Sequence, residues 1–381
     1  MKKDKNVYLI LLCTACFMFG IAGSRPLIPL FAKNLGATNT DIGVIVAMFS
    51  LLPLFLSFPM GKILDEIGPK RPLLYSVGLG AAGLLWPYLS PNLSGIYISQ
   101  VLTGVSQMAF VIAMQTFTGL FKKEETREFN IFIFSIGAAA GNFAGPLFSG
   151  ILSQQKGYAF TFFVLAILSV ISVFLVLLLQ IIDKSDKKSK RTDIDNTVFD
   201  LLKQPGLRNA FLVSALVLIA KDMYIAYFPL LAYEKGISNA LIGLIISINA
   251  GAGVLIRIFL PVIAQKWNRR KVISFSILAI ALLYTTHPIL EHVALFLVIS
   301  FILGICLGIG QPLSISATMS NLPSDQVGKG LGLRLTINKF TQVTIPVFLG
   351  MAASVVGITG VFYMVGFLMF TGTINIRKDK G

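Results

Sequence analysis

Long apolar stretches alternate with short polar segments along the whole chain, and six such stretches lie in each half. A helix of about 20 residues crosses the hydrocarbon core of a bilayer, and these stretches reach that length. The pattern predicts an all-α integral membrane protein with twelve transmembrane helices in two six-helix bundles. The predicted helices span residues 7–32, 41–64, 72–90, 94–120, 127–153, 158–182, 208–233, 241–265, 272–290, 294–319, 328–353 and 358–376.

The two halves share one register. Many residues recur unchanged two hundred positions later, and glycine and proline are prominent among them. Because backbone geometry decides where glycine and proline can stand, an ancient duplication explains these matches better than chance does. The clearest pairs are Pro29 with Pro229, Gly36 with Gly236, Asn39 with Asn239, Gly43 with Gly243, Pro146 with Pro346, Gly150 with Gly350 and Gly157 with Gly357.

The duplication defines the expected domains. Residues 1–183 form the first bundle and residues 208–381 form the second, while the polar, lysine-rich residues 184–207 link them. Two similar halves in an apolar chain are typical of a transporter with its substrate site between the repeats. The first apolar stretch also resembles a secretory signal, but it has an internal counterpart in the second half, so we expect it to be a retained span.

The charge distribution predicts the orientation. Only three of the 32 lysines and arginines, Lys33, Lys156 and Lys235, lie in loops that we expect outside, and most of the others lie in the termini and the remaining loops. This asymmetry is the positive-inside pattern, so we expect a multi-pass protein of the cytoplasmic membrane with both termini in the cytoplasm. No loop combines basic and aromatic residues as a nucleic-acid platform does, so we expect lipid headgroups and no nucleic acid as partners of the basic residues.

One loop carries a recognisable motif. It follows the second predicted span and contains a glycine, an aspartate four residues later, another glycine and then basic residues. This motif resembles the signature of the major facilitator superfamily, which implies the MFS fold and a cytoplasmic latch between spans 2 and 11 that holds the outward-open state. The latch motif comprises Gly61, Asp65, Gly68, Lys70 and Arg71. Glu66 and Pro69 depart from the family pattern, and a simple polar turn is the alternative.

A second motif lies in the fifth span, where Gly141, Gly145 and Gly150 accompany Pro146. Glycines at a spacing of four leave a smooth groove for a neighbouring helix, and proline bends the helix. The pattern resembles part of the Gly-Pro motif of the drug/proton antiporters in this superfamily, although tight helix packing alone also explains it. Gln100 stands in the fourth span where the antiporter pattern has an arginine, which weakens that assignment.

Ionisable residues inside a bilayer are costly, so they are functional candidates. We expect five such residues to lie at depth within the predicted spans: Arg25, Lys221, Asp222, Arg257 and Lys339. The repeat offset places Asp222 and Lys221 on about the same helix face as Arg25, one turn away, so Arg25 and Asp222 are expected partners across the pathway. The alternatives are a structural ion pair that closes the outer gate and, for Arg257, a side chain that reaches the membrane surface.

Polar amides at depth complete the expected site. Asn142 and Gln342 occupy equivalent positions in the two halves, and Asn338 precedes Gln342 by one turn. We expect Asn142, Asn338 and Gln342 to join Arg25, Lys221 and Asp222 around the substrate, with Tyr224 and Tyr227 as walls of the cavity. Such amides also simply hold membrane helices together. The two histidines, His287 and His292, are expected to be solvated residues of an outer turn without a metal.

These patterns together predict a secondary transporter that moves a small molecule by alternating access and is not an enzyme. No P-loop, metal-ligand spacing or catalytic constellation is present, so no cofactor is expected. Asp222 is the carboxylate predicted to lie deep in a span, which points to a proton as the coupling ion. The excess of cations favours an anion, or an amphiphile with an acidic group, as the substrate. We expect a monomer. The alternative is a membrane sensor or scaffold that keeps the fold without transporting.

Overall fold

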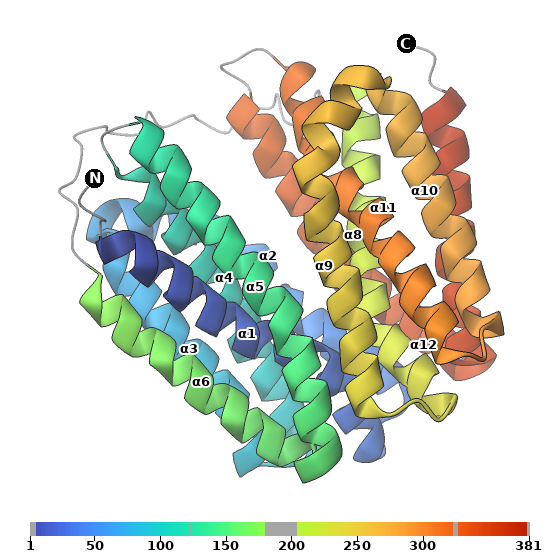
Figure 1. Cartoon of the computed structure of the whole chain (residues 1–381), viewed down its shortest axis with the longest axis horizontal. Helices are drawn as coiled ribbons and strands as arrows, with labels where there is room; N and C mark the ends of the chain where they lie inside the picture. The colour runs from blue at the N-terminus through green and yellow to red at the C-terminus, as the bar shows by residue number, and fades with distance from the viewer. Residues whose placement is uncertain (1–4, 122–123, 180–203, 323–326, 379–381) are drawn as a thin grey trace.

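The computed structural model describes residues 5–121, 124–179, 204–322 and 327–378 (Figure 1). Within these ranges the chain forms eleven α-helices long and apolar enough to cross a membrane, and a short 3-10 helix, η1 (His287–Ile289). The helices are α1 (Lys5–Asn34), α2 (Asn39–Ile67), α3 (Lys70–Leu89), α4 (Leu93–Gly119), α5 (Glu124–Lys156), α6 (Tyr158–Leu178), α8 (Pro205–Glu234), α9 (Asn239–Lys266), α10 (Arg269–Thr286), α11 (Val293–Ser320) and α12 (Val327–Lys378).

The last helix contains two membrane spans. The backbone of α12 leaves helical geometry at Gly357, whose φ of 73° is in the left-handed region that favours glycine. Gly157, its counterpart in the first half, has a φ of 82° and separates α5 from α6. The same break therefore divides α12 into two spans, and the expected all-helical membrane architecture is confirmed.

The repeat is also visible in the helix boundaries. α1 begins at Lys5 and α8 begins at Pro205, whereas α2 and α9 begin at Asn39 and Asn239. Gly36 and Gly236 both adopt positive φ values in the turns before α2 and α9. The predicted linker at residues 184–207 lies mostly outside the described residues, although α8 already includes residues 205–207.

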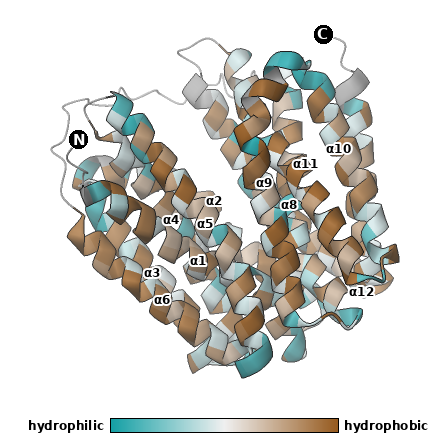
Figure 2. Cartoon of the chain, viewed as in Figure 1, coloured by the Kyte–Doolittle hydropathy of each residue, from teal (hydrophilic) through white to brown (hydrophobic). Residues whose placement is uncertain are grey.

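The helices form two bundles, α1–α6 and α8–α12 (Figure 1). The beginning of α1 and the end of α12 lie at the same face of the molecule, which we call the termini face (Figure 1). The bundles diverge toward the termini face and converge at the opposite face (Figure 1). Hydrophobic residues cover most of the helix surfaces, and hydrophilic residues gather at the two faces (Figure 2), as expected for helices that cross a bilayer.

Paired glycines bring the bundles together near the opposite face. A methyl group at Gly43 of α2 would lie 2.8 Å from the Cα atom of Gly350 in α12. At the symmetry-related contact, a methyl group at Gly243 of α9 would lie 3.1 Å from the Cα atom of Gly150 in α5. The absence of a side chain at these positions allows the two backbones to touch.

Hydrogen bonds surround both glycine contacts. The side-chain amide of Asn39 donates to the carbonyl of Ala353 at 3.0 Å, and Thr40 and Ser354 share a hydrogen bond of 2.9 Å. On the other side, the side-chain amide of Asn239 donates to the hydroxyl of Tyr158 at 3.2 Å. Two pseudosymmetric clusters therefore connect the bundles at the opposite face.

The glycines and the proline of the Gly-Pro motif allow α5 to pack closely against two helices, α1 and α9. Methyl groups at Gly141 and Gly145 would collide with the backbone of α1, and the nearest atoms include the carbonyl oxygens of Ala15 and Phe19. Further along the helix, Gly150 and the carbonyl of Pro146 contact α9 of the other bundle. Close packing of α5 against both neighbours explains the small residues without an additional chemical role.

Candidate functional site

An ion pair joins the two bundles in the middle of the membrane-spanning region. A guanidinium nitrogen (Nη2) of Arg25 in α1 lies 3.4 Å from a carboxylate oxygen (Oδ1) of Asp222 in α8. Their side chains are 19% and 11% exposed. Because Arg25 lies nine residues before the end of α1, the pair lies about 14 Å from the opposite face along the helix axis.

A second hydrogen bond holds the other oxygen of the same carboxylate. The Gln342 amide nitrogen of α12 donates to Asp222 Oδ2 at 2.6 Å, and the Ser50 hydroxyl of α2 donates to Gln342 Oε1 at 3.4 Å. Four helices, two from each bundle, thus contribute to one network. We call these four residues, Arg25, Ser50, Asp222 and Gln342, the interbundle site.

The Arg25 side chain also contacts an aromatic ring and a small cavity. Its guanidinium carbon lies 4.2 Å from the centre of the Phe49 ring, within the range of a cation–π interaction. The cavity is lined by Arg25, Val46, Phe49, Gln100, Ile225 and Ala226 and draws on helices from both bundles. The guanidinium is therefore bordered by one carboxylate and by a mostly apolar wall.

The other three predicted intramembrane cations lie near this network, and two of them are within electrostatic range of its carboxylate. Lys221 is within electrostatic range of Asp222, Arg25 and Arg257, and Lys339 is within range of Asp222 and Arg25. Lys221 and Arg257 are solvent-exposed and Lys339 is partly exposed, although protein surrounds all three.

The predicted amides divide into two groups. Gln342 belongs to the interbundle site, whereas Asn338 is buried within the second bundle and accepts a hydrogen bond of 2.9 Å from Ser214. The side chain of Asn142 donates to the carbonyl of Ala138 in its own helix at 2.7 Å. The structure therefore brings Gln342 to Asp222 but places neither Asn142 nor Asn338 in that network.

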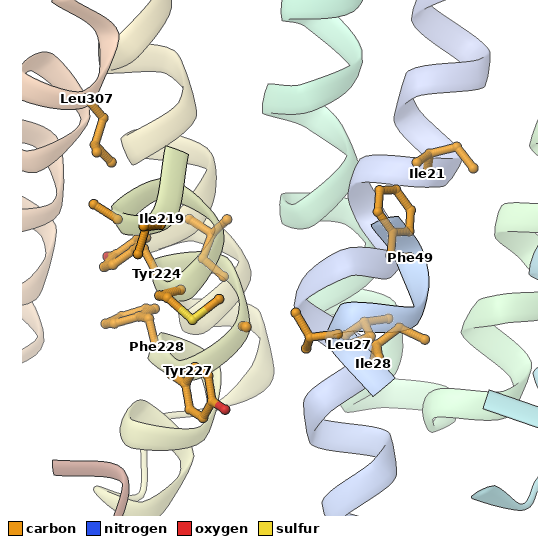
Figure 3. Packing of buried hydrophobic residues seen from close by; sticks show 14 of the residues in the cluster. Ile21, Leu27, Ile28, Phe49, Ile219, Tyr224, Tyr227, Phe228 and Leu307 are labelled. Atoms are coloured by element: carbon orange, nitrogen blue, oxygen red, sulfur yellow. The ribbon is translucent and has the colours of Figure 1, made fainter. Parts of the chain in front are cut away.

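The predicted aromatic wall is wrong for Tyr224. This side chain points away from the first bundle, as Figure 3 shows, and its hydroxyl shares a hydrogen bond of 2.5 Å with Ser300 of α11. Tyr227 is also fully buried, and its hydroxyl donates to the carbonyl of Pro346 at 3.4 Å. Aromatic character alone does not reveal which face of α8 a ring occupies.

The prediction that His287 is solvated is also wrong. The side chain is completely buried, and its Nδ1 atom lies 2.6 Å from the carbonyl of Leu283. Aromatic rings of the second bundle surround it, and Nε2 has no hydrogen-bond partner. The surrounding rings are those of Tyr224, Phe228, Tyr284, Phe296 and Phe362.

Sequence reasoning missed several residues. Ser50 and Phe49 are ordinary residues of an apolar span, and no pattern distinguishes them before α2 is packed against α1 and α12. Arg334 was also missed, although its charge inside the eleventh predicted span was an available signal. It is 4% exposed and donates to Gln311 at 2.5 Å and to Ser314 at 3.1 Å.

The latch motif lies at the termini face. Gly68 ends α2 with a φ of 75°, and the Lys70 ammonium donates to the carbonyls of Leu177 and Leu179 at the end of α6. Within the described residues, a methyl group at Gly61 would meet no neighbour within 4 Å. No described helix therefore approaches Gly61 closely in this conformation, and the side chain of Asp65 lies outside what the structure describes.

Comparison with known proteins identifies the family. A model described as the Major Facilitator Superfamily matches residues 10–220 and, separately, residues 210–378. The chain belongs to the major facilitator superfamily. It is accordingly a multi-pass membrane protein and a secondary transporter of small molecules, not an enzyme.

Full-length relatives of this MFS transporter are distant. An uncharacterized MFS-type transporter of Methanocaldococcus jannaschii is 26% identical, and the match covers 95% of this chain and 94% of the relative. Multidrug resistance protein 2 of Bacillus subtilis is 22% identical, with 97% and 94% covered.

Solved structures show the same fold. The nucleoside transporter NupG superposes with a TM-score of 0.82 at 15% identity, covering 98% of this chain and 99% of NupG. A bacterial homologue of the human lysosomal transporter Spinster, in an inward-facing and occupied conformation, superposes with a TM-score of 0.79 at 11% identity, covering 97% and 95%.

Proposed function

We propose that this MFS transporter couples solute movement to a proton through Asp222. The observation that supports the proposal is the bridging position of the carboxylate, which bonds Arg25 of one bundle and Gln342 of the other. Protonation removes the charge that holds Arg25, so it weakens a contact between the parts that must move relative to each other. Binding of a proton is thereby linked to the rocking of the bundles.

Charged and titratable groups from several helices face this carboxylate. They are Arg25 of α1, Lys221 of α8, Tyr284 of α10 and Lys339 of α12, and Arg257 of α9 lies within electrostatic range of Lys221. The carboxylate therefore faces more positive charge than its single negative charge can balance.

We also propose that the termini face is cytoplasmic. The basic residues that surround the latch motif and follow α9 lie at this face, in agreement with the positive-inside rule. The conformation would then be inward-facing, with the outer ends of the bundles closed through Gly43 and Gly243. The latch would be disengaged here and would form only when the cytoplasmic ends approach each other.

Cysteine labelling tests the orientation. Cysteines that replace Lys33 or Lys156 should react with a membrane-impermeant maleimide in intact cells, whereas a cysteine at Lys188 should react only after permeabilisation. The native cysteines are replaced first; Cys13 and Cys306 are buried and Cys16 is partly buried. Labelling of Lys188→Cys from outside would contradict the proposed topology.

Export of a drug-like compound in exchange for protons is a second candidate. Its support is the full-length relative named Multidrug resistance protein 2, together with shorter matches to Quinolone resistance protein NorA and Staphylopine export protein of Staphylococcus aureus. In an antiporter the proton and the solute compete, whereas in a symporter they bind together. A sensor or scaffold that does not transport is the alternative from another class.

Transport by the reconstituted protein tests the proposal. Proteoliposomes with a lumenal pH dye are exposed to a panel of metabolites and drugs, with and without an imposed pH gradient. A substrate should accumulate only when the gradient is present, and adding it to gradient-free vesicles should shift the lumenal pH. Transport that is indifferent to the gradient would refute proton coupling, and the lack of transport across a broad panel would favour the sensor or scaffold.

A further inference from the structure

The interbundle site holds more positive charge than its carboxylate can balance. Asp222 uses both oxygens, one for Arg25 and one for Gln342. Lys221, Lys339 and Arg257 make no hydrogen bond or ion pair with any residue in the described part of the chain. Three cations, Arg25, Lys221 and Lys339, therefore lie around one acidic group, and Arg257 is within electrostatic range of Lys221. The membrane offers no counterion at this depth.

An excess of positive charge inside the protein is energetically unfavourable unless an anion binds beside it. A charge that is surrounded by protein and lacks a partner loses solvation that no neighbour replaces. The side chains of Lys221 and Arg257 are exposed, so a ligand that enters between the helices can contact them. Their ammonium and guanidinium groups are the usual partners of carboxylate, sulfonate and phosphate oxygens.

The wall next to the Arg25 guanidinium is mostly apolar. Val46 and Phe49 of α2 and Ile225 of α8 line the cavity that contains the Arg25 guanidinium. A small inorganic anion would leave this surface unused, whereas an anion with a hydrocarbon or aromatic body would bury it. Charge at one end and apolar surface at the other define an amphiphilic organic anion as the class of ligand.

We propose that the transporter binds an organic anion whose acidic group replaces Asp222 as the partner of Arg25, so that anion and proton bind together. The inference rests on the proposed coupling at Asp222 and adds both a substrate class and a sign of coupling. When Asp222 is ionised it occupies Arg25 and repels an incoming anion. When Asp222 is protonated, Arg25 is released and the repulsion is gone.

The sign follows from thermodynamic linkage. If protonation of Asp222 strengthens anion binding, then anion binding strengthens protonation by the same factor. The affinity for the anion rises as the pH falls through the titration of Asp222, by up to about tenfold per pH unit for a single linked proton. The complex carries the charge of the solute and one proton together, which corresponds to symport.

Binding to the purified full-length protein in detergent tests this inference without requiring transport. The probes are 4-butylbenzenesulfonate and 4-butylbenzoate, their neutral analogue 4-butylbenzamide and the cation 4-butylbenzylamine. Isothermal titration at mildly acidic and mildly alkaline pH gives each affinity, and a weakly buffered sample reports proton uptake. Both anions should bind more tightly in acid and take up a proton, and the amide and amine should bind at least tenfold more weakly.

Variants separate the residues involved. Lys221→Gln and Lys339→Gln should each weaken anion binding about tenfold or more, the loss expected for a charge-assisted hydrogen bond. Lys235→Gln, at the outer end of the same helix as Lys221, removes the same charge outside the site and should leave the affinity unchanged. Asp222→Asn should bind the sulfonate with an affinity that no longer depends on pH.

The outcomes distinguish this inference from the proposed function. Preference for the amine or amide, absence of anion binding, or anion binding that is independent of pH or strengthens with rising pH would each overturn the inference. If a neutral or cationic solute shows gradient-driven transport while the anions fail to bind, the coupling proposal survives and the inference fails. If the anions bind with a proton but nothing is transported, the inference survives and the proposed function fails.

Discussion

Replacing Asp222 with asparagine should abolish uphill accumulation of the substrate while downhill exchange remains measurable. Asparagine keeps the shape of the side chain, and its amide oxygen can still accept from Gln342, but it cannot bind and release a proton. A pH gradient then has no means of acting on the bundles. The measurement is uptake into proteoliposomes with and without the gradient, compared with counterflow in its absence.

The pair Arg25–Asp222 requires a stability control. Removing one member of a buried pair leaves the other uncompensated, which costs up to about 3–5 kcal/mol. Asp222→Asn is therefore examined beside the double variant with Arg25→Gln, in which neither charge remains, and thermal unfolding in detergent reports whether each protein is folded. Glu291→Gln, an exposed carboxylate away from the site, should transport like the unmodified protein.

The double variant also separates coupling from structure. If Asp222 carries the proton, the double variant should fold well yet still ignore the pH gradient. Accumulation that depends fully on the gradient in Asp222→Asn or in the double variant would show that Asp222 serves only as the partner of Arg25.

Alanine at Gly43 or Gly243 should force the opposite face open. A methyl group at either glycine would overlap the carbonyl of Pro346 or Pro146 and crowd the facing glycine backbone. Overpacking of this kind costs about 1–3 kcal/mol, enough to shift a two-state equilibrium by roughly fivefold to a hundredfold. We expect the described conformation to lose population and transport to fall accordingly.

Spin labels on cysteines at Lys156 and Lys235 report this shift, because these exposed residues lie at the opposite face on different bundles. The distance distribution should lengthen in Gly43→Ala and Gly243→Ala. Gly78→Ala is the matched control, since a methyl group there meets no described atom within 4 Å. An unchanged distance distribution in both Gly43→Ala and Gly243→Ala would show that the glycine contacts do not keep the opposite face closed.

Asp65→Asn should shift the same distances the other way. If the latch stabilises the state that is closed at the termini face, loss of its charge near a helix N-terminus removes about 0.3–1 kcal/mol from that state. The described conformation then gains population and transport slows, although the protein stays folded. If the distances in Asp65→Asn equal those of the unmodified protein, the latch motif is only a polar turn and does not affect the conformational equilibrium.

The sequence by itself determined the spans, the repeat and the pairing of Arg25 with Asp222. Hydropathy over a whole span reports transfer from water to lipid, so it does not depend on which helices are neighbours. The turns at Gly36, Gly157 and their counterparts were fixed by backbone conformation, which is local. The ion pair followed because the repeat offset placed two opposite charges at equivalent depth on symmetry-related helices.

Only the tertiary structure decided which side chains meet. In a membrane helix both the lipid-facing and the bundle-facing sides are apolar, so the hydrophobic pattern does not mark the interior face as it does in water. For that reason only helix packing showed that Phe49 contacts Arg25 and that Ser50 donates to Gln342. The same ambiguity explains why the predicted environment of Tyr224 was wrong and why the burial of His287 was not predicted. The sequence does not show which neighbouring helices either side chain faces.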